Sequence, residues 1–398
     1  MGTDVYFKKV IPLRYGGRVL QFRVAHDLFS SHDIDQGTRM LLRSLDGENR
    51  RFASALDLGC GYGAIGLAMR AAGHVEMAHM VDRDALALDY ARQNAQLNSI
   101  DGVEIYGSLG YDDVPAARFD LIVSNIPGKA GEPVISHLLL DAAGHLVPGG
   151  LVAVVVIDSI VPYVTSILEG APEVEVVYRR DTAAYSVFHY RFTADAGVAP
   201  GPGFDRGVYE WRRVEFMCNG VSMGLRTAHD LPEHEGPSRA TELLLESIAA
   251  VGADDARRCV MFNPGQGYAP AYLAKHATPS LIDLVDRDLL SLRHTRGNLL
   301  SGGYVGRVEL WHQTGLAGLG EAAPASLIAG VLREDEGPAA VLATVDAAAD
   351  QLAPGGLLLL GAGSTAATRV EKHLRSRRDL RVRERKRKRG SSMLVVRR

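Results

Sequence analysis

The stretch "LDLGCGYGAIG", residues 56–66, joins an apolar run to a cluster of glycines. Its first half is typical of a buried strand, and its second half begins an apolar helical pattern. Gly61, Gly63 and Gly66 form the pattern G-x-G-x-x-G, which by itself is a weak signal for a nucleotide site. The stretch predicts a turn from a strand into a helix, where glycines let a ligand approach the backbone.

Strands and helices alternate on both sides of this turn. The predicted strands cover residues 54–59, 75–82 and 103–107, and the predicted helices cover residues 62–73 and 83–98. This alternation predicts an α/β fold in which helices cover both faces of a parallel sheet. Two later strands, 173–180 and 185–192, are separated by four residues, which is too short for a helical crossover. We therefore expect them to form an antiparallel hairpin.

The same pattern occurs twice along the chain. "FRVAHDLFSSHDIDQGTRMLLRSL" at 22–45 is matched by "LRTAHDLPEHEGPSRATELLLESI" at 225–248, and "MVDRDALAL" at 80–88 is matched by "LVDRDLLSL" at 284–292. An internal repeat of this length predicts two copies of one fold in tandem. We expect the copies at residues 1–193 and 208–398, joined by the Gly- and Pro-rich linker 194–207.

The composition excludes several classes of protein. The start, "MGTDVYFKKVIPLRYGG", lacks the apolar run of a signal peptide, and no apolar stretch has membrane-spanning length. The three cysteines, Cys60, Cys218 and Cys259, are too few and too scattered for a disulfide framework or a zinc site. We expect a cytoplasmic protein with no metal ion and no membrane partner.

Two carboxylates near the glycine turn suggest what it binds. Asp57 precedes Gly59 by two residues, where it would repel a pyrophosphate but would suit a ligand that carries an ammonium group. Asp82 ends the next predicted strand, a position from which a carboxylate can accept hydrogen bonds from ribose hydroxyls. S-adenosylmethionine has both groups, and we expect it as the cofactor.

Further residues would complete this cofactor site. Gly59, Gly61 and Gly63 would let the backbone approach the methionine portion of the cofactor, because no side chain intervenes. Ser108 and Leu109 follow the third predicted strand and would flank the adenine. The alternative, a tight turn without a ligand, does not explain why two carboxylates accompany the glycines.

The motifs "DLGCGYG", "VDRD" and "FDLIVSNIPG" resemble those of the class I S-adenosylmethionine-dependent methyltransferases. The preceding "DLFSSHDIDQGTRMLL" is similar to a segment of the bacterial ribosomal RNA guanine-N2 methyltransferases, the small-methyltransferase-domain group. Those proteins are tandem duplications with one degenerate copy, and the resemblance covers nearly the whole chain. It implies two Rossmann-like domains, each with a mostly parallel seven-stranded sheet that ends in an antiparallel hairpin. It also implies that Gln36, Gly37 and Thr38 lie against the methionine end of the cofactor.

The end of the predicted strand 119–123 carries the residues that the resemblance marks as catalytic. In the family pattern this strand ends N-P-P-aromatic, and the asparagine accepts a hydrogen bond from an exocyclic amino group. This chain reads Asn125-Ile126-Pro127-Gly128, so the asparagine and one proline remain while the aromatic is absent. The resemblance implies that Asn125 and Pro127 form the catalytic motif, with Asn125 also beside the cofactor.

Other residues would then hold the acceptor. Phe29 or Tyr185 would supply a ring that stacks on a base, and Lys129 would contact a phosphate. A ring buried in the core or at a sheet edge, and a solvated loop lysine, are the alternative interpretations of these three residues.

The second copy has diverged at the expected site. Aligning Gly59 with Gly265 gives these replacements: Asp57 by Asn263, Gly63 by Ala269, and "SNIPG" by "GVLRE" at 330–334. Asp286 still matches Asp82. We therefore expect one cofactor site, in the first copy, and a substrate-binding or scaffold role for the second.

Positive charge is concentrated near the end of the second copy. Residues 369–389 hold twelve Lys and Arg against three acidic residues, a net charge of +9 in a chain of net charge -3. We expect RNA phosphates to contact the run Arg385, Lys386, Arg387, Lys388 and Arg389. The alternative is a charged sheet edge that prevents strand pairing.

Three functions of different class fit these observations. The first is methylation of an exocyclic amino group of a base in ribosomal RNA. The second is methylation of a small-molecule or protein amine, and the third is ligand binding without catalysis. The duplication further predicts a monomer whose two domains pack as a pseudo-dimer.

Overall fold

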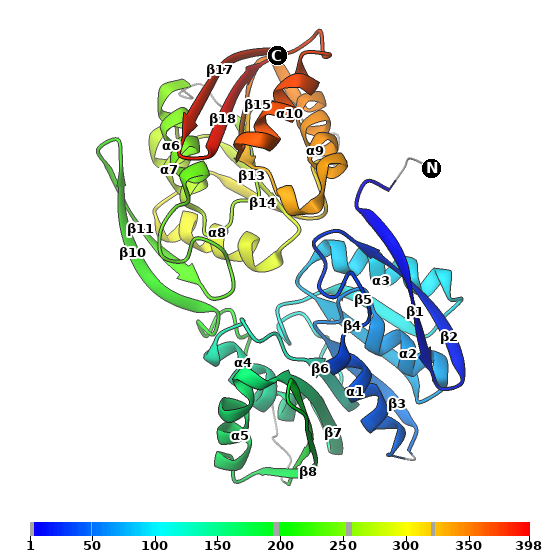
Figure 1. The fold of residues 1–398 in the computed structure, drawn as a ribbon. Coiled ribbons are helices and arrows are strands. Elements are labelled where there is room, and N and C mark those ends of the chain that lie inside the picture. Colours follow the sequence, from blue (N-terminus) through cyan, green and yellow to red (C-terminus); the bar gives the residue numbers. More distant parts are fainter. Residues whose placement is uncertain (1–3, 49, 194–198, 252–256, 320–322) are drawn as a thin grey trace. The chain divides into compact units, whose positions relative to one another are not determined.

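A computed structural model describes residues 4–48, 50–193, 199–251, 257–319 and 323–398 (Figure 1). The chain divides into two compact units. The N-terminal unit is Phe7–Tyr209, and the C-terminal unit is Glu210–Arg398 together with the residues up to Tyr6. No helix in the described ranges is both long enough and apolar enough to cross a membrane.

The N-terminal unit is built on a seven-stranded sheet. Its strands and helices are β1 (Phe7–Tyr15), β2 (Arg18–Ala25), α1 (Gln36–Asp46), β3 (Phe52–Leu58), α2 (Ala64–Ala72), β4 (Val75–Asp82), α3 (Ala85–Leu97), β5 (Val103–Gly107), β6 (Phe119–Asn125), α4 (Glu132–Leu140), β7 (Leu146–Ile157), α5 (Val161–Gly170), β8 (Val174–Asp181) and β9 (Tyr185–Phe192). The sheet order is β5-β4-β3-β6-β7-β9-β8. β9 pairs antiparallel with both β7 and β8, while the other pairings are parallel.

The C-terminal unit repeats this architecture. Its strands and helices are β10 (Glu210–Cys218), β11 (Val221–Ala228), α6 (Arg239–Val251), β12 (Arg258–Phe262), α7 (Tyr268–His276), β13 (Leu281–Asp286), α8 (Leu289–Ser301), β14 (Arg307–His312), β15 (Ala325–Val331), α9 (Pro338–Asp350), β16 (Leu352–Gly363), α10 (Ser364–Leu374), β17 (Arg381–Lys388) and β18 (Ser391–Arg397). The order β14-β13-β12-β15-β16-β18-β17 matches the first sheet strand for strand. The predicted fold class, two tandem α/β copies that each end in an antiparallel hairpin, is confirmed.

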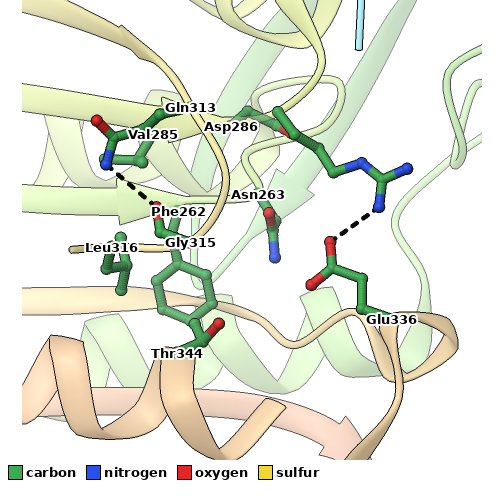
Figure 2. A pocket seen from close by; sticks show the side chains of 10 residues that line it. Phe262, Asn263, Val285, Asp286, Gln313, Gly315, Leu316, Glu336 and Thr344 are labelled. Carbon is green, nitrogen blue, oxygen red and sulfur yellow. Dashed lines mark hydrogen bonds and ion pairs between the residues drawn. The ribbon is translucent and has the colours of Figure 1, made fainter. Parts of the chain in front are cut away.

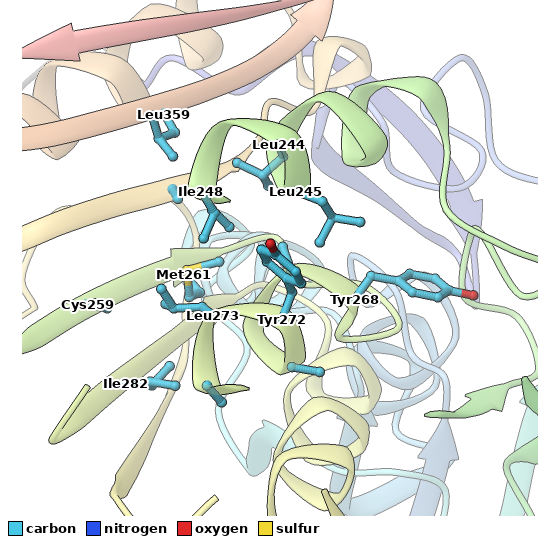
Figure 3. Close-up of a cluster of buried hydrophobic side chains, with 14 of the residues drawn as sticks. Leu244, Leu245, Ile248, Cys259, Met261, Tyr268, Tyr272, Leu273, Ile282 and Leu359 are labelled. Atoms are coloured by element: carbon cyan, nitrogen blue, oxygen red, sulfur yellow. The ribbon is translucent and has the colours of Figure 1, made fainter. Parts of the chain in front are cut away.

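The alternation of side chains along β12 shows why helices cover both faces of the sheet. Cys259 and Met261 enter a buried cluster with side chains of α6, α7 and α8 (Figure 3). Val260 and Phe262 enter a separate cluster with side chains of α9 and α10. Successive residues of a strand point to opposite faces, so an uninterrupted apolar strand is stable only where both faces are covered.

Each unit begins with a two-stranded antiparallel sheet that the sequence analysis did not predict, β1–β2 and β10–β11. The two turns are Gly16-Gly17, with φ values of 54° and 73°, and Asn219-Gly220, with φ values of 47° and 78°. Two-residue hairpin turns of this type require positive φ at both positions, which Gly and Asn tolerate best. A Gly-Gly or Asn-Gly dipeptide between two apolar runs is therefore the sequence signal for each of these hairpins.

Part of the predicted linker is packed on the N-terminal unit. Residues 194–198 of that linker lie outside the described residues. The backbone N–H groups of Gly203 and Phe204 donate to the two carboxylate oxygens of Asp112, at 2.6 and 2.9 Å. Arg206 forms an ion pair with Asp141. Because of these contacts the division falls after Tyr209, and not at the composition change near 194.

The hydrogen bonds also correct the predicted alignment of the two glycine turns. Gly63 precedes α2 with φ 95° and donates to the Cys60 carbonyl, and Gly267 precedes α7 with φ 89° and donates to the Pro264 carbonyl. Gly63 is therefore equivalent to Gly267 and not to Ala269. The correct pairs are Asp57 with Met261, Gly59 with Asn263, and Gly61 with Gly265. Repeated glycines two residues apart allowed the incorrect register, and the backbone geometry resolves it.

Candidate active site

The glycine turn of the N-terminal unit leaves backbone exposed at the carboxyl end of β3. Gly59 and Gly61 have φ values of 68° and 56°, a region in which residues with side chains are strained. A Cβ atom on either glycine would meet no other atom within 4 Å, so open space lies in front of this backbone. Gly63 completes the turn and begins α2. The turn thus forms a cradle that a ligand can enter and a side chain would obstruct.

Asp82 connects this turn to the end of β4. Its Oδ2 accepts the Gly61 N–H at 2.9 Å, and its Oδ1 accepts the Asp84 N–H at 2.9 Å. Burial and the neighbouring Asp84 carboxylate raise the pKa of Asp82 to about 6. Each carboxylate oxygen has further lone pairs, so the partly exposed side chain can still accept ribose hydroxyls.

Asp57 lies behind the turn and is only 1% exposed. Its Oδ2 accepts the Gly66 N–H of α2 at 2.8 Å, whereas its Oδ1 has no hydrogen-bond partner among the described residues. Burial raises the pKa of Asp57 to about 7. A buried acceptor without a donor is costly unless a cation or donor compensates it. Because Asp57 lies behind the turn, the ammonium group of a ligand would act on this carboxylate through the turn and not by direct contact.

Ser108 and Leu109 follow β5, as the sequence predicts, but both are almost fully buried. The Ser108 hydroxyl donates to the Gly110 carbonyl at 2.8 Å and accepts the Asp113 N–H at 3.0 Å. These bonds close the loop on itself. The hydroxyl of Ser108 is thus engaged in shaping the loop that would flank the adenine.

The N-terminus of α1 meets the end of β6 at one carboxylate, that of Asp35. Its Oδ2 accepts the Asn125 Nδ2–H at 2.9 Å and the Thr38 N–H at 3.0 Å, and its Oδ1 accepts the Tyr185 hydroxyl at 2.8 Å. A Cβ on Gly37 would lie 2.7 Å from the Tyr185 ring, so glycine lets the ring pack there. Four predicted site residues thus surround Asp35, which was not among the predicted site residues. The signal in the sequence was the position of Asp35 in the segment "DIDQGT", two residues before Gly37.

Two residues after Asn125 are exposed, while Ile126 between them and the strand is buried. Pro127 and Lys129 face solvent, and no ion pair involves Lys129 in the described part of the chain. A Cβ on Gly128 would lie 2.5 Å from Ile157 Cδ1, so an aromatic at this position would require the end of the half-exposed Ile157 side chain to move. Phe29 is 70% exposed and offers a ring in its place.

The corresponding pocket of the C-terminal unit is closed by its own side chains (Figure 2). Asp286, the counterpart of Asp82, accepts Arg333 Nη2 at 2.5 Å and the Ser291 hydroxyl at 2.7 Å. Arg287 and Glu336 form a buried ion pair at 3.1 Å in the same pocket. Arg333 and Ser291 thus occupy the Asp286 carboxylate, which would otherwise be available to a ribose. Met261 supplies no charge in place of Asp57.

The structure divides the predicted RNA-contact residues into two groups. Arg385 pairs with Glu371 at 2.9 Å and Lys388 with Glu242 and Glu246, both at 3.2 Å. Lys386 lies 3.9 Å from Glu384. By contrast, the exposed Arg387 and Arg389 form no ion pair with any described residue. Arg385 and Lys388 are therefore paired with carboxylates of the C-terminal unit itself.

The fold and the cofactor cradle define a class I S-adenosylmethionine-dependent methyltransferase. Residues 19–189 match the family model described as "Methyltransferase small domain". An uncharacterized protein of Bacillus subtilis, YbxB, is 31% identical over 150 residues, which are 37% of this chain and 74% of that protein. The chain therefore belongs to the methyltransferase small domain family. The predicted class of enzyme and its predicted cofactor are confirmed at this level.

Relatives with assigned activities match about a third of the chain. A ribosomal RNA small subunit methyltransferase C of Haemophilus influenzae is 35% identical over 140 residues, 34% of this chain and 41% of that protein. A ribosomal RNA large subunit methyltransferase G of Shewanella loihica is 30% identical over 163 residues, 37% of this chain and 40% of that protein. The chain thus matches less than half the length of each.

The two-unit architecture has a counterpart among solved structures. A T. thermophilus 16S rRNA N2 methyltransferase, solved in complex with AdoMet and guanosine, covers 98% of this chain and 98% of its own, with a TM-score of 0.69 and 17% identity. At this identity the likeness concerns the fold alone. It extends over both units, whereas the family model matches only the first.

The raised pKa values predict a pH-dependent cofactor affinity. Ribose hydroxyls and an ammonium group both favour ionised carboxylates, so we expect the dissociation constant of S-adenosylmethionine to rise as pH falls from about 7 through about 6, the pKa values of Asp57 and Asp82. Titration calorimetry between these pH values and pH 8 measures it.

The stability of the cofactor-free protein should rise as pH falls, whereas its affinity for the cofactor should decrease. A folded pKa above the usual value of 3.8 means that the folded protein binds the proton more tightly than the unfolded chain. These groups therefore stabilise the cofactor-free protein more as pH falls from about 7 toward 3.8. Asp57→Asn should remove the part of the affinity change nearest pH 7. An affinity that is constant between pH 6 and 8 would contradict the proposed roles of both carboxylates.

Proposed function

We propose that this chain methylates an exocyclic amino group of a base in ribosomal RNA. The observation that carries the proposal is the position of Asn125 at the carboxyl end of β6. β6 is the strand next to β3, whose own carboxyl end leads into the cofactor cradle. The relatives named as ribosomal RNA methyltransferases support RNA as the acceptor.

The chemistry at Asn125 requires alignment more than proton transfer. S-adenosylmethionine supplies a methyl group on a sulfonium centre, which is already activated for transfer. An exocyclic amine is a poor nucleophile, because its lone pair is conjugated with the ring. Hydrogen bonds from the amine to the Asn125 side chain and to a backbone carbonyl beside Pro127 would direct that lone pair toward the methyl group.

A base that leaves its helix needs a surface on which to stack. Phe29, on the exposed loop between β2 and α1, offers an unobstructed ring. Tyr185 is less available, since its hydroxyl is bonded to Asp35. We assign the stacking contact to Phe29, and a phosphate contact to Lys129.

The C-terminal unit would hold the RNA by its phosphates while the N-terminal unit carries out methyl transfer. We define the basic surface as the exposed arginines of β17 and its turn that form no ion pair with any described residue: Arg381, Arg383, Arg387 and Arg389. α10, which packs against β17, adds Arg369 and Lys372 (Figure 1). Phosphate contacts of this kind position an RNA without reading its sequence.

Methylation of a small-molecule or protein amine is the second candidate. The glycine at position 128 favours it, because the aromatic that stacks on a base in the family pattern is absent there. The acidity of the chain outside residues 369–389, a net charge of -12 against +9 within them, also disfavours general RNA binding.

Product mapping distinguishes the two candidates. The enzyme is incubated with methyl-labelled S-adenosylmethionine and an extract from cells that lack the protein, and the RNA, protein and small-molecule fractions are separated. We expect the label in ribosomal RNA and, after nuclease digestion, on the exocyclic nitrogen of one base. Label in protein or in small molecules alone would support the second candidate and overturn the first.

The basic surface predicts a specific change in salt dependence. Replacing Arg381, Arg383, Arg387 and Arg389 by Gln should weaken RNA binding. It should also reduce the slope of log affinity against log salt by about 0.7 to 0.9 for each lost phosphate contact, or about 3 in all. Binding isotherms at several salt concentrations measure the slope. Cofactor affinity should not change, because these residues are in the other unit.

A charge-matched control separates local contact from net charge. Replacing Arg14, Arg18, Arg43 and Arg51, four exposed arginines of the N-terminal unit, by Gln removes the same charge. If this control lowers the slope as much as the first variant, the effect is not local to β17. Arg385→Gln should instead lower the melting temperature, because Glu371 loses the less exposed of its two arginine partners.

A further inference from the structure

The Asp35 carboxylate receives three hydrogen bonds and stands between Asn125 and Tyr185. Asp35 is the N-cap residue of α1, and its Oδ2 accepts the Thr38 N–H. The same oxygen accepts Asn125 Nδ2, and Oδ1 accepts the Tyr185 hydroxyl. These partners come from the start of α1, the end of β6 and the start of β9, which are distant in sequence.

The chemistry of a carboxylate determines which way the Asn125 amide points. An ionised carboxylate only accepts hydrogen bonds, so the side of the amide that faces it must be the NH2 group. The second amide hydrogen donates to the Thr38 hydroxyl at 3.2 Å. No donor within the described part of the chain bonds to Asn125 Oδ1. The carbonyl oxygen is thus turned away from Asp35 with its lone pairs available.

We propose that Asp35 is a positioning residue that fixes the Asn125 amide with its oxygen toward the acceptor amine. The proposal rests on the proposed function, in which Asn125 accepts a hydrogen bond from that amine. If the amide rotated by half a turn, its oxygen would face the carboxylate and both N–H bonds would be lost. The NH2 group of Asn125 would then face the acceptor amine. Because an amide NH2 only donates hydrogen bonds, it could not accept one from that amine.

Asp35 is itself held in place from both sides. The Tyr185 hydroxyl fixes Oδ1, and the Tyr185 ring lies against Gly37, where a Cβ would approach ring carbons to 2.7 and 2.9 Å. Close packing of this kind leaves the ring little freedom to move. The site therefore has a continuous chain of contacts that runs from Gly37 through Tyr185 and Asp35 to Asn125.

A role only as helix cap is the competing explanation, and one substitution separates the two roles. Serine is also a strong N-cap residue, so Asp35→Ser keeps an acceptor for the Thr38 N–H. Its side chain is too short to reach Asn125 and Tyr185 as well. We expect a melting temperature and a cofactor dissociation constant close to those of the parent, and a kcat lower by on the order of tenfold or more. Asp35→Asn keeps an acceptor oxygen within reach of Asn125 and should restore most of the activity.

A double-mutant cycle provides the readout that a structural role would not change. Methyl transfer to total RNA from cells that lack the protein is measured for Asp35→Ser, Asn125→Ala and the double variant. We expect the double variant to be no slower than Asn125→Ala, because Asp35 acts through Asn125. Additive losses would overturn the proposal. Asp288→Ser makes the same exchange at the N-cap of α8, where Asp288 accepts the Leu290 N–H at 3.0 Å, and should leave activity unchanged.

The outcomes also distinguish this inference from the proposed function. If Asn125→Ala transfers methyl groups at the parental rate, the role of Asn125 in the proposed function fails. If Asn125→Ala is slow while Asp35→Ser is as active as the parent, that role stands and the positioning role of Asp35 is wrong.

Discussion

Asn125→Ala should lose methyl transfer by on the order of one hundredfold or more while it binds S-adenosylmethionine as tightly as the parent. Deleting one positioned polar contact to a reacting group typically costs this much. The Asn125 amide donates to Asp35 and Thr38, and in the proposed function it contacts the acceptor, whereas other residues form the cofactor cradle. Single-turnover rates and calorimetric titration measure the two quantities separately.

A neighbouring residue of the same strand is the control for Asn125. Ser124 is buried, and its hydroxyl donates to the Leu58 carbonyl at 2.8 Å. Ser124→Ala therefore removes one hydrogen bond from the end of β6 without touching the acceptor site. It should cost little activity compared with Asn125→Ala. If both variants lose activity equally, the strand end and not the Asn125 amide limits the reaction.

Asp82→Ala should weaken S-adenosylmethionine binding by on the order of one hundredfold. Hydrogen bonds to a charged group contribute about 1.5 to 3 kcal/mol each, and a ribose offers two hydroxyls. Truncation also leaves the N–H groups of Gly61 and Asp84 without their acceptor, which loosens the glycine turn. Titration calorimetry should give a stoichiometry near one for the parent protein, because only the N-terminal unit keeps an available carboxylate.

Asp286→Ala is the matched control in the C-terminal unit. It removes the carboxylate equivalent to Asp82, but Arg333 and Ser291 already occupy that carboxylate. Cofactor affinity should stay at the parental value, while the melting temperature should fall because Arg333 loses its counter-ion. A stoichiometry near two, or a parental affinity in Asp82→Ala, would refute the assignment of a single site.

The sequence determined the architecture because its signals are local or repeat at fixed spacing. Alternating strand and helix patterns predicted a parallel sheet in each copy, and the four residues between the last two predicted strands required a hairpin. Asp82 could be selected because it ends a predicted parallel strand, at the edge where α/β sheets bind ligands, and Asn125 because its segment resembles a family motif. The strand order found in both units agrees with these expectations.

Tertiary structure alone decided what each charged side chain does. Asp35 and Asn125 are brought together by α1 and β6, and Arg385 meets Glu371 only because α10 packs against the final hairpin. A count of net charge does not distinguish among the basic residues of 369–389. An arginine paired inside the unit stabilises the fold, while an exposed arginine remains available to a phosphate. The register of the second glycine turn likewise depended on backbone geometry, namely the positive φ values and the turn hydrogen bonds that precede α2 and α7. Contacts between residues far apart in the chain depend on the packing of whole elements, which local sequence patterns do not specify.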